Sequence, residues 1–174
     1  MQIQGELSVN KLILLFVFDK MESPLSENTV VEMCTVGNDW LNYMDCVDLL
    51  PRLLDGGFLC SIPTVDEPLY TLTSDGRETL NNFYVVIPKS IRDEISAFVK
   101  KNSGKFRNRQ ECKSDYFQNA DGTYTVYLKI LAPLQPMLEL KFVVPDKKTA
   151  QNIYKNWEFK ASDLYSAIYD TLVD

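Results

Sequence analysis

The stretch FLCSIPTVDEPLYTLTSDGRETL, residues 58–80, decides the fold of the first half of the chain. Residues 58–62 and 69–72 favour extended structure, and the proline and acidic residues between them favour a turn, so the pattern predicts a hairpin. Thr73 can then cap a helix in which Gly76 allows close approach to neighbouring backbone. The expected local structure is a hairpin that runs directly into a helix.

Three helical patterns precede this hairpin. The first starts after Ser8 or Asn10 and ends near Met21, and its apolar residues are dense enough to predict burial on most sides. The second starts after the cap Ser26, and the third after the cap Asn42. Three helices, a two-stranded wing and a fourth helix follow the order of a winged helix-turn-helix.

The third predicted helix spans residues 43–55. At helical spacing, the residues predicted to face inward are Tyr43, Val47, Leu50 and Leu54. Pro51 lacks an N–H group and clashes with the preceding turn, which predicts a kink or a break. Gly56 and Gly57 are expected to end the helix with a left-handed cap.

The second half of the sequence differs in kind, because a helix in residues 87–102 is followed by alternating strand patterns. The predicted strands occupy residues 114–118, 123–130 and 137–144, with a turn at 119–122. Two closing helices, residues 146–157 and 162–172, would cover the apolar sheet face. We therefore predict an α+β protein: a winged-helix domain, 1–86, and a small antiparallel sheet covered by helices, 87–174, that serves dimerisation or sensing.

The residue inventory argues against several classes of function. The chain has no histidine, its seven glycines form no phosphate-binding loop, and no carboxylate, lysine and tyrosine spacing resembles a catalytic set. The four cysteines, Cys34, Cys46, Cys60 and Cys112, are scattered along the chain. This spacing predicts structural thiols. We expect no enzyme, no metal site and no cofactor. The longest apolar run, residues 13–18, is too short for a membrane span and follows no signal peptide, so we expect a cytoplasmic protein.

The net charge of −6 is unevenly distributed. Up to residue 80 the sequence has four cations and thirteen carboxylates, a net charge of −9. Beyond residue 80 it has fourteen cations and eleven carboxylates, a net charge of +3. The two parts of the chain therefore have opposite electrostatic character.

Several motifs resemble an uncharacterised bacterial family that carries a domain-of-unknown-function label. They are LYTLTSDGRETLNNF, IPKSIRDEI, YTVYLKI, FVVPDKKTAQNIYKNW, the tyrosine-rich final helix, and NYMD at residues 42–45. The resemblance covers nearly the whole chain and implies an N-terminal winged helix, hence a transcriptional regulator by analogy of fold. One departure is LAPLQPM, residues 131–137, where the family more often has a charged turn.

The third helix would be the recognition helix, whose N-terminal residues enter the major groove. It offers Asn42, Tyr43 and Arg52 to DNA, although a helix cap is the favoured role for the first and a core aromatic for the second. Asp45 and Asp48 would meet phosphates. The predicted wing tip carries Asp66 and Glu67, and both segments therefore disfavour DNA electrostatically.

The segment KKNSGKFRNR supplies the strongest basic cluster, around Phe106. Its cations are Lys100, Lys101, Lys105, Arg107 and Arg109. They could contact phosphates, dock on the acidic half of a partner subunit, or form the solvated end of a helix and its loop.

Two hypotheses follow. The first is a winged-helix DNA-binding transcriptional regulator that acts as a homodimer. The alternative is a winged-helix module for protein–protein interaction that has lost DNA binding, because its recognition helix and wing are acidic. The second half could hold a small molecule under its half-open sheet, but no residue set in the sequence identifies a ligand.

Overall fold

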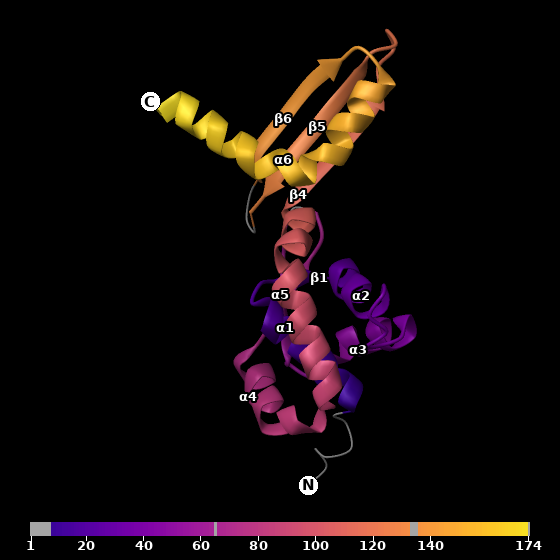
Figure 1. Ribbon diagram of the computed structural model, residues 1–174, viewed down its shortest axis with the longest axis vertical. Coiled ribbons are helices and arrows are strands. Elements are labelled where there is room, and N and C mark those ends of the chain that lie inside the picture. The colour runs from indigo at the N-terminus through magenta and orange to yellow at the C-terminus, as the bar shows by residue number, and fades with distance from the viewer. Residues whose placement is uncertain (1–7, 65, 133–135, 174) are drawn as a thin grey trace. The chain divides into compact units, whose positions relative to one another are not determined.

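The computed structural model describes residues 8–64, 66–132 and 136–173. It is a mixed α+β protein, as predicted, and it divides into two compact units, Met1–Gly104 and Lys105–Asp174 (Figure 1). The domain limits predicted from the sequence, 1–86 and 87–174, stay a prediction.

In its described residues, the first unit contains four α-helices, three short strands and the beginning of a fifth α-helix. In chain order these are α1 (Val9–Met21), β1 (Leu25–Ser26), α2 (Glu27–Thr35), α3 (Tyr43–Asp55), β2 (Leu59–Ile62), β3 (Leu69–Leu72), α4 (Ser74–Phe83), a 3-10 turn (Tyr84–Val86) and α5 (Lys89–Glu111). Both strand pairings are antiparallel and give the sheet order β1-β3-β2. The hairpin predicted in residues 58–72 is present.

Side-chain caps start the four helices α1 to α4 where the sequence placed them. The capping oxygens belong to Ser8, Ser26, Asn42 and Thr73, and each accepts a hydrogen bond from the backbone N–H three residues ahead. The first helix is buried on nearly all sides, since every residue from Leu12 to Phe18 is buried. It packs against α3, α4 and β3 and forms the centre of the unit.

The α3 helix corrects the inward face predicted for Tyr43 and the break predicted at Pro51, whereas a kink at Pro51 stays a prediction. Tyr43 is 60% exposed and does not face inward; the buried residues are Cys46, Leu49, Leu50 and Leu53. The buried stripe is therefore rotated around the helix from the predicted one, and Tyr43 lies outside the packed face. The helix also continues unbroken past Pro51, which lies on the exposed side, where water can bond the carbonyl that loses its N–H partner.

The junction between the hairpin and α4 depends on close packing of backbone. The Thr73 hydroxyl donates to the carbonyl oxygens of Gly57 and Phe58, at 2.7 and 3.1 Å. A Cβ atom at Gly76 would lie 2.2 Å from the Phe58 carbonyl oxygen. The close approach expected at Gly76 is confirmed.

The second unit is an antiparallel sheet packed on one long helix. Its elements are β4 (Cys112–Gln118), β5 (Tyr124–Leu131), β6 (Pro136–Val144) and α6 (Lys147–Val173), with strand order β4-β5-β6. The core joins Val126, Leu128 and Ile130 of β5 to Ala150, Trp157 and Ala161 of α6. The Trp157 indole N–H donates to the Lys129 carbonyl at 2.9 Å, which ties the helix to the central strand.

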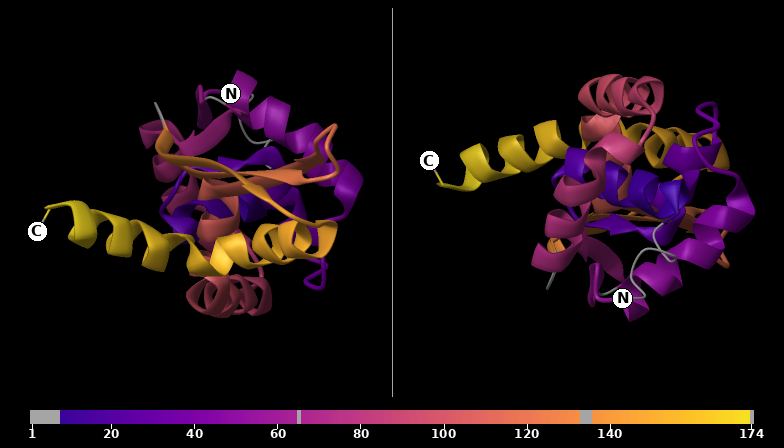
Figure 2. Two further views of the ribbon diagram at one scale, coloured as in Figure 1. Left: turned by 90° about the horizontal axis from the view of Figure 1, so that it is seen from above. Right: turned by 90° about the horizontal axis from the view of Figure 1, so that it is seen from below.

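Two predicted helices in this half are one helix of 27 residues. Residues 158–161 continue the helix because they have good helix propensity and Ala161 is buried against the sheet. Figures 1 and 2 show the last turns of α6 extending past the strands. The α5 helix likewise continues to Glu111, so the loop expected after residue 102 is helical. The departure noted at residues 131–137 falls partly outside the described residues, at 133–135.

Candidate functional site

The N-terminus of α3 is held by a reciprocal pair of hydrogen bonds. The backbone N–H of Asp45 donates to Asn42 Oδ1, and Asn42 Nδ2 donates to Asp45 Oδ2, both at 2.8 Å. Asn10 Nδ2 on α1 donates to the same Asp45 oxygen at 2.9 Å. The Asn42 amide therefore acts as the helix cap, and Asp45 joins α3 to α1.

The solvent-facing side of α3 is mixed in character. Tyr43 and Met44 are 60% and 64% exposed, and Asp48, Arg52 and Asp55 are exposed beyond them. This face offers an aromatic hydroxyl, one guanidinium group and two carboxylates. It can hydrogen-bond a base edge, but it contributes little attraction for phosphates.

The hairpin tip is acidic, as the sequence indicated. Asp66 is exposed, whereas Glu67 is half-buried and accepts from Asn28 Nδ2 at 3.5 Å. The Thr64 hydroxyl donates to the Glu67 carbonyl at 2.5 Å. Across residues 1–104, eight cations and fifteen carboxylates give a net charge of −7, and residues 105–174, with ten cations and nine carboxylates, have +1.

The structure distributes the predicted basic cluster over both units. Lys100 and Lys101 belong to the first unit, and Lys105, Arg107 and Arg109 belong to the second. All five cations are exposed, whereas Phe106 is only 8% exposed.

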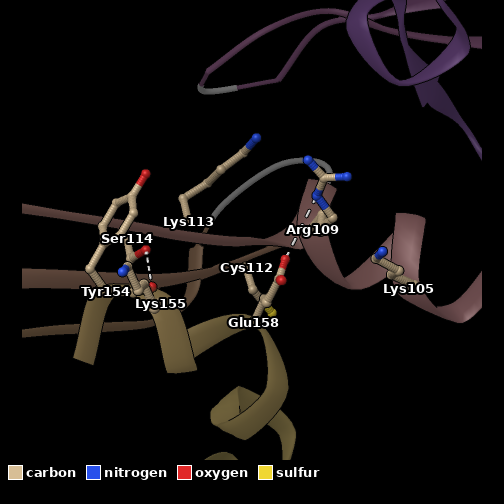
Figure 3. A pocket seen from close by; sticks show the side chains of 8 residues that line it. All are labelled: Lys105, Arg109, Cys112, Lys113, Ser114, Tyr154, Lys155 and Glu158. Atoms are coloured by element: carbon tan, nitrogen blue, oxygen red, sulfur yellow. Dashed lines mark hydrogen bonds and ion pairs between the residues drawn. The ribbon is translucent and has the colours of Figure 1, made fainter. Parts of the chain in front are cut away.

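The second unit brings two of these cations into a basic cavity of about 580 Å³ (Figure 3). Its lining residues are Lys105, Arg109, Cys112, Lys113, Ser114, Tyr154, Lys155 and Glu158. The lining thus contains four cations and one carboxylate, and Arg109 Nε lies 3.7 Å from Glu158 Oε2. The Ser114 hydroxyl donates to the Tyr154 carbonyl at 3.1 Å, which joins β4 to α6 in the wall of the cavity.

Sequence reasoning identified Lys105 and Arg109 but missed Lys113 and Lys155. These two lysines are far apart in the sequence, and both line the cavity only because α6 packs against β4. No local motif marks them, since a lysine on an edge strand or an exposed helix is common.

The thiol in this cavity is not poised for nucleophilic chemistry. Burial, followed by the nearby carboxylates of Glu111 and Glu158, raises the pKa of Cys112 to about 11. The neutral thiol is therefore the form present near neutral pH, and it is a weak nucleophile.

A second cavity, of about 560 Å³, is lined by aromatic residues of the same unit. Its lining residues are Asp115, Tyr116, Phe117, Gln118, Tyr124, Lys147 and Tyr154. The rings of Tyr116 and Tyr154 meet edge to face, with centroids 5.7 Å apart. Tyr154 lines both cavities, so a cationic region and an aromatic region adjoin at this residue.

In residues 8–64, 66–132 and 136–173, the structure contains no group of three or more histidine, cysteine or acidic residues arranged to hold a metal ion. Over the same part of the chain, every helix is too short or too polar to cross a membrane.

These features define a two-unit α+β protein with an acidic, mainly helical first unit and a basic cavity in the second. The chain belongs to the family described as domain of unknown function (DUF4364), whose model matches residues 10–172. The resemblance to an uncharacterised domain family is thereby confirmed. No curated protein and no solved structure matches the chain.

Proposed function

We propose that this protein is a cytoplasmic winged-helix transcriptional regulator that binds DNA as a homodimer. The observation that carries the proposal is the element order α1-β1-α2-α3-β2-β3, together with the pairing of β1 and β2 on either side of β3. In that reading α2 and α3 are the helix-turn-helix, α3 is the recognition helix, and the hairpin β2-β3 is the wing.

The exposed face of α3 supplies the groups for direct readout. The Tyr43 hydroxyl and the Arg52 guanidinium can bond base edges or phosphates, and Asp48 can accept from the amino group of cytosine. The acidic surface lowers non-specific affinity, because few phosphates are neutralised. Binding would therefore depend on base contacts and on a second copy of the chain more than on general attraction to DNA.

The last turns of α6 support a dimer. The helix face that buries Ala150, Trp157 and Ala161 continues through Leu164 and Leu172, which are 38% and 80% exposed. An apolar stripe that extends beyond the sheet on which the helix packs is a suitable surface for a second copy of the same helix.

Selection of genomic fragments by the purified protein tests this proposal. We expect a small set of fragments to be enriched at physiological salt. Arg52→Gln should abolish the enrichment, whereas Lys89→Gln, which removes an equally exposed cation elsewhere in the first unit, should retain it. Equal behaviour of both variants would count against α3 as the recognition helix.

The exposed apolar pair on α3 favours the alternative function. Tyr43 and Met44 are both exposed, and Met44 shares a helix face with Asp48 and Asp55, a composition that suits a protein partner with a basic, apolar surface. A module of this kind would have lost DNA binding. Specific retention of a single genomic fragment at physiological salt would exclude this alternative.

A further inference from the structure

We infer that the second unit binds a small phosphorylated aromatic molecule, a nucleoside diphosphate or triphosphate, in the two cavities that adjoin at Tyr154. The inference uses only residues of the second unit and does not depend on the proposed DNA binding. It assigns a chemical class of ligand to the sensing role considered for this half of the chain.

The cationic cavity fits the phosphates. Lys105, Arg109, Lys113 and Lys155 line it with a single carboxylate, Glu158, so its ionisable lining is net positive in a chain of net charge −6. In Figure 3 a dashed line joins Arg109 to Glu158, and the Lys105 and Lys113 side chains come from α5 and β4. Lysine and arginine donors recognise phosphate oxygens through charge-assisted hydrogen bonds.

The salt bridge within the cavity defines its charge more closely. Arg109 Nε lies 3.7 Å from Glu158 Oε2, so the one carboxylate of the lining is paired with one of its cations. Glu158 offsets one of the four cations. The lining therefore contains more cations than carboxylates, which suits an anionic group such as a diphosphate.

The aromatic cavity fits the base. Tyr154 is 45% exposed, and its ring is supported from one side by Tyr116, edge to face at 5.7 Å. The ring therefore has a fixed orientation and an accessible surface, on which a planar base can stack. Asp115 and Gln118 also line this cavity, and they provide acceptors and donors for the polar edge of a base.

The size of the site agrees with this class of ligand. The two cavities are of about 580 and 560 Å³, within the range of roughly 300–1,000 Å³ that small-molecule sites occupy. Their separation into a basic part and an aromatic part corresponds to the two ends of a nucleotide. A lone phosphate would use only one of them.

Isothermal titration calorimetry on the full chain tests the inference, with ADP, inorganic pyrophosphate and adenosine as probes. We expect ADP to bind more tightly than pyrophosphate, and adenosine to bind most weakly. Lys105→Gln and Lys155→Gln should each weaken ADP and pyrophosphate by about tenfold, since each removes one charged donor. Lys141→Gln, which removes an exposed lysine of β6 outside both cavities, is the matched control and should leave binding unchanged.

A further variant separates the two parts of the site. Tyr116→Leu, which changes a β4 residue that lines the aromatic cavity alone, should weaken ADP while leaving pyrophosphate binding intact, and circular dichroism would verify that the fold is retained. The inference is overturned if neither ADP nor pyrophosphate binds at millimolar concentration and low salt, or if the two lysine variants bind both probes like the parent. Binding of a labelled single-stranded oligonucleotide without binding of ADP would also overturn it, because the ligand would then be a nucleic acid.

Discussion

Replacing Gly76 by alanine tests how the hairpin and α4 pack together. The added Cβ would lie 2.2 Å from the Phe58 carbonyl oxygen and 3.0 Å from a methyl carbon of Leu72. The carbonyl oxygen belongs to the backbone and accepts from both the N–H and the hydroxyl of Thr73, each at 3.1 Å. Relief of the overlap therefore requires α4 to move away from the hairpin and weakens these hydrogen bonds.

The expected magnitude combines opposing effects. Inside a helix, Gly→Ala ordinarily stabilises a protein by about 1 kcal/mol. Overpacking costs about 1–3 kcal/mol, and each weakened hydrogen bond about 1 kcal/mol more. We therefore expect Gly76→Ala to lower the free energy of unfolding of the first unit by about 2–3 kcal/mol.

Gly104→Ala is the matched control, because Gly104 is also helical and a Cβ there would meet nothing within 4 Å. This variant should stabilise the protein by about 0.5–1 kcal/mol. Urea unfolding, with hydrogen exchange of the α1 and α4 peptides as the readout, would measure the stability change of each variant. The reasoning is refuted if Gly76→Ala is as stable as the parent, or if both variants shift stability in the same direction.

Three further predictions concern the second unit. Trp157→Phe should cost about 1–3 kcal/mol in urea unfolding, because it leaves the Lys129 carbonyl without its indole donor; an unchanged midpoint would contradict the packing of α6. Iodoacetamide should label Cys112 slowly near pH 8, because the raised pKa keeps its thiol protonated, and about tenfold faster for each pH unit towards 11. The exposed Cys60 should react first, and equal labelling rates for the two cysteines would be inconsistent with the raised pKa of Cys112. Leu172→Glu should shift the mass in solution towards the monomer, as measured by light scattering; a dimer that persists would place the interface elsewhere.

The sequence predicted the local features of the fold well. The caps at Ser26, Asn42 and Thr73 depend on one side-chain oxygen and the N–H three residues ahead, so neighbouring residues suffice to identify them. The close approach at Gly76 was foreseeable because glycine in a helix usually has a packing reason.

The errors concern features that depend on tertiary packing. Tyr43 matched the helical spacing of one possible inward face, but packing buries a different face, which begins at Cys46. The break predicted before residue 162 is absent because the sheet supports a continuous α6 through Ala161. Lys113 and Lys155 entered the candidate site only through the packing of that helix on β4, which no local pattern encodes.

Fluorescence anisotropy with labelled duplex DNA, made from the selected genomic fragments and from the region upstream of the protein's own reading frame, tests the central claim most directly. The titration would be done at low and then at physiological salt. A winged-helix regulator should bind, and its affinity should fall with salt at a log–log slope of roughly 0.9 per phosphate contact. No binding even at low salt would contradict DNA recognition by this protein and would favour the first unit as a surface for a protein partner.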